Sequence, residues 1–303
     1  MMNQLKYQDL KSSDLILSKM MSNQYGSFVP KNHIANKLVW KYRYLQDIKA
    51  IRGNSTFLGL ILSHLLRKEN RLLNYKDWKK SWDYLPKEYV KRNFGIEFTD
   101  ETPGKDIVEV FIDKIYSSFQ GFAPTENDVI LDVGAQFGDY ALLCSNYAGS
   151  KEVISLEPLK DNFNILLKNL RINAAKNVDA YNYAASSSNG KTKLHISGNM
   201  GAKIGGGKIE EVSTVTLDSF YDKGPTLMKI DVEGFELDVL NGAKQILKDF
   251  RPRIILETHS RVLKNASIKF LSDFAYSVDF EGRKVFVDQP GMDYVQNVYF
   301  SAK

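Results

Sequence analysis

Acidic side chains stand at the ends of three short apolar runs in this sequence. Asp132 lies in Val-Ile-Leu-Asp-Val, Glu157 ends Glu-Val-Ile-Ser-Leu-Glu, and Asp231 ends Leu-Met-Lys-Ile-Asp. Such runs predict buried parallel strands, whose carboxyl ends meet at one edge of a sheet, where ligands of open α/β proteins bind. We therefore expect the three carboxylates to face a common ligand.

A glycine turn follows the first of these acids. Gly134 and Gly138 bracket Gln136, and from Tyr140 apolar residues recur at i, i+3, i+4 and i+7, which predicts a helix. Glycine is expected at such positions where the backbone comes close to a ligand. A strand, a glycine turn, a helix and a second strand that ends in Glu157 form the opening of a nucleotide-binding βαβ unit.

The glycine turn argues against a dinucleotide ligand. A dinucleotide site uses the pattern G-x-G-x-x-G, whose second glycine lets the backbone approach a pyrophosphate, and Gln136 stands at that position. Asp132 would repel a diphosphate but suits a cationic amino-acid end. S-adenosylmethionine carries an adenosine, a sulfonium and an ammonium group but no phosphate, and therefore fits this turn. A structural turn with an incidental acid is the alternative.

A second group of ionisable residues begins at Asp231. Glu233 follows two residues later, and the next predicted strand runs into Glu257 and His259. A carboxylate or an imidazole could remove the proton of a hydroxyl group, and the ordinary pKa of histidine suits that task. Asp231, Glu233 and His259 are therefore the candidate catalytic bases. The alternative for His259 is a structural histidine whose nitrogens are satisfied by hydrogen bonds.

The same region offers a metal site as an alternative. Asp231, Glu257 and His259 could hold a divalent cation that acidifies the hydroxyl group. Their spacing forms no compact ligand motif, however, and we therefore expect catalysis without a metal.

Length and composition are those of a globular protein. Of 303 residues, 43% are hydrophobic and 25% are charged. No run of 18 apolar residues is present, which argues against a membrane span, and residues 1–19 lack the apolar core of a signal peptide. The single cysteine, Cys144, excludes an internal disulfide and is expected to pack on the buried face of a helix. A cytoplasmic location is the expectation.

Hydrophobic periodicity continues the alternation of strands and helices. Asn189-Gly190 predicts a hairpin turn between two strands, and the glycine-rich segment 197–208 predicts either a mobile lid or a plain surface loop. The strands predicted after Glu157 are 178–185, 192–196, 227–230, 253–259, 276–287 and 298–300.

Charge is distributed unevenly along the chain. Residues 1–125 hold 20 Lys and Arg against 13 Asp and Glu, whereas the remainder holds 21 against 23. The segment 67–92 interleaves nine bases and four acids with aromatic residues, a mixture that could stack on nucleic-acid bases and attract phosphates. A solvated helical surface with inward-packed aromatic residues is the more common reading. These aromatic residues are Tyr75, Trp78, Trp82, Tyr84 and Tyr89.

Five segments carry a family resemblance. The most specific is Lys229-Ile-Asp-Val-Glu-Gly-Phe-Glu236, which continues into Val239-Leu-Asn-Gly-Ala243. Together the segments resemble the FkbM family of S-adenosylmethionine-dependent methyltransferases, from residue 105 or 125 to residue 260. Gln136 departs from the family pattern, which usually has asparagine there. The other segments are Asp132–Gly138, Glu157-Pro158, Asn169-Leu170 and Thr216-Leu-Asp218.

The resemblance implies a class I methyltransferase. Its fold would be Rossmann-like, a mostly parallel seven-stranded sheet with helices on both faces, formed by residues 106–303. Residues 1–105 would be a mainly helical region that acts as a cap or as a substrate or oligomer contact. The implied reaction is O-methylation of a hydroxyl on a sugar, a glycan or a small metabolite. An anionic acceptor, such as a phosphorylated sugar, would suit the basic N-terminal half.

The resemblance also assigns roles within the site. The glycine turn would hold the methionine portion of S-adenosylmethionine, Glu157 the ribose hydroxyls, and Tyr183 and Ala184 would border the adenine. Asp231 and Glu233 would face the transferred methyl group or the substrate. The implied cofactor residues are Asp132, Gly134, Gln136, Gly138, Glu157, Tyr183, Ala184 and Asp231.

Two alternatives stay open. An RNA methyltransferase could use the basic segment 67–92, although Asp231-Val-Glu-Gly stands where a base-amine methyltransferase would carry Asn-Pro-Pro-Tyr. A nucleic-acid partner is therefore less favoured than a small molecule or a glycan. A non-catalytic binding module that retains the fold is the second alternative. The acceptor and the oligomeric state have no signal in the sequence.

Overall fold

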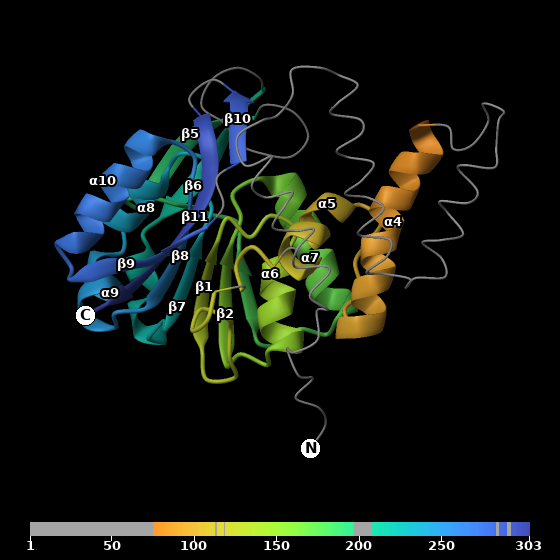
Figure 1. Ribbon diagram of the computed structural model, residues 1–303, viewed down its shortest axis with the longest axis horizontal. Coiled ribbons are helices and arrows are strands. Elements are labelled where there is room, and N and C mark those ends of the chain that lie inside the picture. Colours follow the sequence, from red (N-terminus) through yellow and green to blue (C-terminus); the bar gives the residue numbers. More distant parts are fainter. Residues whose placement is uncertain (1–74, 113, 118, 197–207, 283–284, 290–291) are drawn as a thin grey trace, which may run out of the picture.

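The computed structural model of the chain describes residues 75–112, 114–117, 119–196, 208–282, 285–289 and 292–303. A sheet of eight strands forms the centre of this part (Figure 1). Five strands are parallel, in the order β8 (Arg253–Thr258), β7 (Leu227–Ile230), β1 (Val129–Val133), β2 (Glu152–Leu156) and β3 (Val178–Tyr181). The antiparallel strands are β9 (Tyr276–Glu281), β10 (Val285–Gln289) and β11 (Met292–Ala302).

Helices cover both faces of the sheet (Figure 1). Successive residues of a strand point to opposite faces, and β1 accordingly contributes Ile130 to one apolar core and Leu131 to the other. All five residues of β1 are buried, and burying one such aliphatic side chain contributes about 1.5–3 kcal/mol. The first core includes residues of α6 (Asp139–Leu142), which continues as a π-helical segment to Tyr147, and of α7 (Lys160–Ile172). The second core includes residues of α8 (Glu236–Asn241), α9 (Lys244–Asp249) and α10 (Arg261–Ser272).

The predicted mostly parallel sheet with helices on both faces is confirmed. The described sheet has eight strands rather than seven because β11 is 11 residues long. Its beginning pairs with β10 and its end pairs with β9, while its other edge lies against β8.

The predicted strand 178–185 is wrong in its second half. The strand β3 ends at Tyr181, and Asn182 then donates its side-chain amide to the carbonyls of Glu157 and Pro158. These bonds turn the chain away from the sheet toward a small second sheet. The predicted hairpin at Asn189-Gly190 is also wrong, because neither flanking strand pairs with the other. The second sheet contains β4 (Ala184–Ala185), β6 (Lys208–Val215) and β5 (Gly190–Ile196), in that order.

The first described residues, 75–112, contribute to the apolar core on one face of the larger sheet. They include α4 (Tyr75–Phe94) and α5 (Gly104–Ile107), which continues as a π-helical segment to Ile112. Val90 and Ile96 are fully buried in the core that contains Ile130. The domain boundary at residue 105 stays a prediction.

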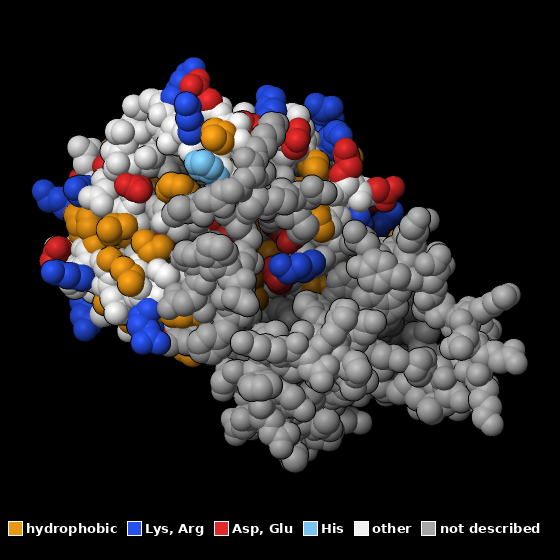
Figure 2. All heavy atoms as spheres, turned by 90° about the horizontal axis from the view of Figure 1, so that it is seen from above, with side chains coloured by type: hydrophobic (Ala, Val, Ile, Leu, Met, Phe, Trp, Pro, Cys, Tyr) orange, Lys and Arg blue, Asp and Glu red, His pale blue; other side chains and the backbone are white. Residues whose placement is uncertain are grey.

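Several predictions fall wholly or partly on residues outside the described part. Residues 1–74 and 197–207 lie outside it, and with them residues 67–74 of the basic segment and nearly all of the glycine-rich segment. Of the aromatic residues in the basic segment, Tyr84 is exposed, whereas Tyr89 packs against the core. On the face seen from above, the basic and acidic side chains of the described residues are interspersed (Figure 2). A nucleic-acid partner stays a prediction.

Two compositional predictions concern described residues. Cys144 is a free cysteine in the core, where it is fully buried, as expected. Among the described helices none has the length and apolarity needed to cross a membrane. The cytoplasmic location stays a prediction.

Candidate active site

The register of the parallel strands aligns the acids at one edge. The last row of paired residues across these strands consists of Leu156, Val133, Ile230 and Leu256. The residues that directly follow this row are Glu157, Gly134, Asp231 and Glu257. Acids that are up to 100 residues apart in the sequence therefore stand at one edge, because each comes one residue after this row. This confirms that the strand ends meet at a common edge.

The glycine turn after β1 owes its glycines to contacts within the protein. A Cβ atom on Gly134 would lie 1.8 Å from the backbone oxygen of Asp231, and one on Gly138 would lie 3.2 Å from Cγ of Leu166. Both glycines also have positive φ angles, 78° and 81°. The close approach expected from the sequence is thus made to β7 and α7. Gln136 adopts a positive φ of 48°, a conformation that is strained for a residue with a side chain.

Glu157 is held by the backbone around it. Its Oε2 accepts the N–H of Gln136 at 2.9 Å, its Oε1 accepts the N–H of Leu159 at 2.9 Å, and Asn162 reaches Oε1 at 3.4 Å. Burial raises the pKa of Glu157 to about 7, although these hydrogen bonds act in the opposite direction. Each carboxylate oxygen has two lone pairs, so Oε2, which accepts only the N–H of Gln136 among the described residues, can still accept a hydrogen bond from a ligand.

Asp132 stands one residue inside the edge and is fully buried. The Nζ atom of Lys229 lies 3.3 Å from its Oδ1 and donates to the carbonyl of Gly134 at 2.7 Å. The same Nζ lies 5.2 Å from the ring centre of Tyr116. Burial raises the pKa of Asp132, and the charge of Lys229 opposes that shift. The charge of Asp132 is therefore balanced inside the protein, and through Lys229 it supports the glycine turn.

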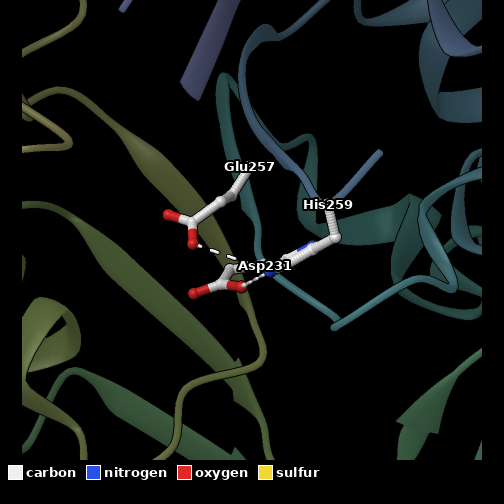
Figure 3. Close-up of side chains that lie close together, drawn as sticks. All are labelled: Asp231, Glu257 and His259. Atoms are coloured by element: carbon white, nitrogen blue, oxygen red, sulfur yellow. Dashed lines mark ion pairs between the residues drawn. The ribbon is translucent and has the colours of Figure 1, made fainter. Parts of the chain in front are cut away.

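The side chains of Asp231, Glu257 and His259 point toward one another (Figure 3). The Nε2 atom of His259 lies 3.7 Å from Oδ1 of Asp231 and 3.7 Å from Oε1 of Glu257. Oε2 of Glu233 lies 3.8 Å from the same nitrogen. Tyr116 approaches from the other side, where its hydroxyl lies 2.9 Å from Oδ2 of Asp231 and 3.3 Å from Oε2 of Glu257.

His259 is oriented by an acid at the start of α8. Its Nδ1 lies 2.6 Å from Oε1 of Glu236, and both side chains are buried. Burial lowers the pKa of His259, but the hydrogen bond with Glu236 and the charges of Asp231 and Glu257 raise it to about 10. With these partners alone, His259 is an imidazolium at neutral pH and cannot accept a proton. Burial raises the pKa of Glu257 to about 8, and the charge of Asp231 adds to the shift.

Tyr183 and Ala184 follow β3 at the other end of the row. The ring of Tyr183 is 37% exposed and stacks against Tyr181, with 6.4 Å between ring centres. Asn182 ties this segment to the backbone of Glu157. Ala184 packs against a small cluster beside Leu159. The structure therefore brings Tyr183 and Glu157 into neighbouring segments, as the sequence-based assignment requires.

Three residues that take part in the site were not identified from the sequence. Lys229 and Glu236 belong to the quoted motif around Asp231, so their place in that motif was a usable signal. Tyr116 had none, because it lies 115 residues from Asp231 in a segment without a recognisable pattern.

The comparisons with known proteins agree with this site. The model of the methyltransferase FkbM domain matches residues 132–278, which include both groups of acids. A relative, the hexuronic acid methyltransferase AglP of Haloferax volcanii, is 32% identical over 161 residues. That match covers 51% of this chain and 65% of the relative, so the chain spans slightly less than two thirds of the relative's length.

Solved structures show a weaker likeness. The FkbM methyltransferase of Methylobacillus flagellatus KT has a TM-score of 0.43 at 18% identity, with 60% of this chain and 47% of the other covered. The fibrillarin of Aeropyrum pernix, solved with natively bound S-adenosyl-L-methionine, has a TM-score of 0.37 at 17% identity, with coverage of 58% and 67%. The domain match to residues 132–278, together with the AglP similarity, confirms the resemblance to FkbM methyltransferases seen in the sequence.

Proposed function

We propose that this chain is an S-adenosylmethionine-dependent methyltransferase that methylates a hydroxyl oxygen of a sugar, free or within a glycan. The observation that carries the proposal is the alignment of Glu157, Gly134, Asp231 and Glu257 in one row at the carboxyl edge of the sheet. Ligands of open α/β sheets bind at that edge. The match to the FkbM domain supports methyl transfer, and the similarity to a hexuronic acid methyltransferase supports a sugar acceptor.

The residues at the β2 end of the row fit the cofactor. S-adenosylmethionine has two adjacent ribose hydroxyls, and Glu157 has two carboxylate oxygens that each hold only one backbone N–H. Tyr183 offers a partly exposed ring, which suits the border of an adenine. The turn from Gly134 to Gly138 would hold the methionine portion, with Asp132 behind it. When bound, S-adenosylmethionine supplies a methyl group on a positively charged sulfur.

The residues at the β7 end of the row fit an acceptor. An acceptor hydroxyl must lose its proton, and a general base contributes about 10²–10⁴-fold to such a reaction. The side chains of Asp231 and Glu233 are 23% and 37% exposed, whereas that of His259 is 2% exposed. We therefore assign proton removal to Asp231 or Glu233. His259 would position these carboxylates through its Nε2.

The proposal is tested by binding and by product formation. Purified full-length protein should bind S-adenosylhomocysteine in a calorimeter, and it should convert S-adenosylmethionine to S-adenosylhomocysteine when supplied with a suitable sugar. A panel of neutral sugars, hexuronic acids and phosphorylated sugars identifies the acceptor, and mass spectrometry of the product locates the new methyl group. Absence of S-adenosylhomocysteine binding to folded protein would overturn the proposal.

A further inference from the structure

We propose that Asp231, Glu257 and His259 form a binding site for a divalent metal ion, for which Mn²⁺ is the best match. The site itself follows from the geometry of these side chains. Its role in catalysis, described below, rests on the proposed function.

The distances from His259 to the two acids are those of ligands that share an ion. One ligand atom from each residue can be chosen such that all three lie within 4.8 Å of one another, and Nε2 of His259 is 3.7 Å from an oxygen of each acid. These separations exceed the roughly 3.2 Å limit of an N–H···O hydrogen bond. Ligands bound at about 2.0–2.2 Å from one ion lie about 3–4 Å apart. Figure 3 shows the three side chains converging on a common point.

The partners of the three side chains provide an independent argument. The side chain of His259 is 2% exposed, and its Nδ1 is bound by Glu236, whereas no hydrogen bond of its Nε2 is present within the described residues. A histidine that ligates a metal through one nitrogen is usually held through the other by a carboxylate. Each acid likewise has one oxygen bound by another side chain, because the hydroxyl of Tyr116 is hydrogen-bonded to Oδ2 of Asp231 and Oε2 of Glu257. The oxygens that remain, Oδ1 and Oε1, are those nearest Nε2.

Charge around the imidazole favours a divalent cation. Oxygens of Asp231, Glu233, Glu236 and Glu257 all lie within 3.8 Å of one of its nitrogens. Acidic side chains that crowd around one imidazole repel one another when charged, and a cation among them relieves that repulsion. An ion bound to Nε2 takes the place of the proton there and adds a further positive charge.

The ligand types narrow the choice of ion. Carboxylates suit Mg²⁺ and Mn²⁺, whereas imidazole suits Zn²⁺ and other transition metals. Mn²⁺ accepts both ligand types. Three protein ligands leave further coordination positions, which suit the adjacent oxygens of a sugar or the carboxylate of a uronic acid. An anionic acceptor would otherwise meet repulsion from the acids in this part of the edge.

The catalytic role follows if the chain transfers methyl groups as proposed. A divalent cation lowers the pKa of a hydroxyl group that coordinates it. Glu233 lies outside the ligand set but close to it, 3.8 Å from Nε2 of His259, and its side chain is partly exposed. It would then accept the proton of the acceptor hydroxyl, while Asp231 holds the ion.

The test measures metal binding without a methyl donor or acceptor. Full-length protein is stripped with a chelator and titrated with Mn²⁺, and the free ion is followed by electron paramagnetic resonance. We expect one bound Mn²⁺ per chain, with an affinity that falls at least about tenfold in Glu257→Gln. Glu157→Gln is the matched control, since it makes the same change at another buried acid of the same sheet edge, and its Mn²⁺ affinity should equal that of the unmodified protein.

Three outcomes overturn the inference: no binding of Mn²⁺ at millimolar concentration, an undiminished affinity in Glu257→Gln, or an equal loss in Glu157→Gln. If Glu257→Gln does not fold, Asp231→Asn replaces it, and saturating Mn²⁺ should raise the thermal midpoint of the unmodified protein. S-adenosylhomocysteine binding is measured on the same stripped protein. Binding of the cofactor product without Mn²⁺ binding refutes the metal site alone, and the reverse result refutes the proposed function alone.

Discussion

The two halves of the acidic edge are built in different ways. In the β2 half, Glu157 is held by the backbone N–H groups of Gln136 and Leu159. In the β7 half, the carboxylates of Asp231 and Glu257 contact the side chains of Tyr116 and His259 within the part of the chain that the structure describes. A site formed by backbone N–H groups depends on the path of the chain, and its hydrogen bonds persist when side chains are substituted. A site formed by side chains changes its ligand contacts with each substitution. We infer that the first half serves a fixed ligand and the second half a ligand that can vary.

Replacement of Asp231 should have the largest effect. In Asp231→Asn we expect kcat to fall by about 10²–10⁴-fold, because the variant loses a charge on which the acceptor half depends. Steady-state kinetics at saturating S-adenosylmethionine measure this loss, and circular dichroism checks the fold. The affinity for S-adenosylhomocysteine should change much less than kcat. An equal loss of both would mean that the two halves are not separate.

Replacement of Gly134 tests the close contact between the glycine turn and the backbone of Asp231, where the two halves of the edge meet. In Gly134→Ala a Cβ atom would stand 1.8 Å from the backbone oxygen of Asp231, in a residue with a φ of 78°. We expect the free energy of unfolding to fall by about 3 kcal/mol, from strain and forced displacement of β7. Denaturant titration measures it. Gly149→Ala is the control, because its φ is also positive, 67°, but nothing lies within 4 Å of its Cβ position. Equal losses in both variants would leave only backbone strain as the cause.

Replacement of Glu157 should affect the cofactor half alone. In Glu157→Gln the affinity for S-adenosylhomocysteine should fall about 10–100-fold, since hydrogen bonds to a charged group contribute about 1.5–3 kcal/mol. Calorimetry measures this change. An unchanged affinity would remove Glu157 from the cofactor site.

The stability of the unliganded protein should report the buried charge of Glu157. Its pKa is about 7 in the folded chain, above the ordinary value of 4.5, so the folded state binds more protons between these values. The contribution of this group to stability is therefore highest below pH 4.5 and declines as pH rises to 7. Glu157→Gln should lack this decline, and the difference between the two proteins in urea titrations at pH 5 and pH 8 measures it. A constant difference would contradict the assignment.

Removal of the Tyr116 hydroxyl should have the smallest effect. Tyr116→Phe keeps the aromatic ring, whose centre lies 5.4 Å from the ring centre of Tyr140 in an edge-on contact. The substitution removes the hydrogen bonds to Asp231 and Glu257. We expect a loss of about 1 kcal/mol in the free energy of unfolding and a lower kcat at unchanged cofactor affinity. Thermal melts and kinetics measure these effects. A weaker affinity for S-adenosylhomocysteine would break the division of the edge into two halves.

The sequence predicts the β2 half of the site better than the β7 half, for a physical reason. The strand ends, the glycine turn and Glu157 are local patterns, because a buried strand needs an apolar run and Glu157 directly follows such a run. The same logic places Asp231 and Glu257 at the edge. Strand 178–185 was predicted too long because the hydrogen bonds of Asn182 to the backbone after Glu157 are long-range contacts.

The interactions within the β7 half could not be predicted from local patterns. Tyr116 reaches Asp231 and Glu257 from a segment more than a hundred residues away. His259 was considered as a base from its ordinary pKa, yet Glu236 and the neighbouring acids raise that pKa to about 10. The convergence of Asp231, Glu257 and His259 is equally invisible in their spacing. It arises only when β7 and β8 pair in register.

The shared last row of the parallel strands limits how this protein can vary in length. Each acid of the edge stands one residue past a row that the hydrogen-bonded register fixes. A single-residue deletion inside β1, β2, β7 or β8 would turn the following side chain to the opposite face of the sheet. Homologues can therefore exchange one apolar residue for another within these strands, whereas insertions and deletions should be confined to the loops.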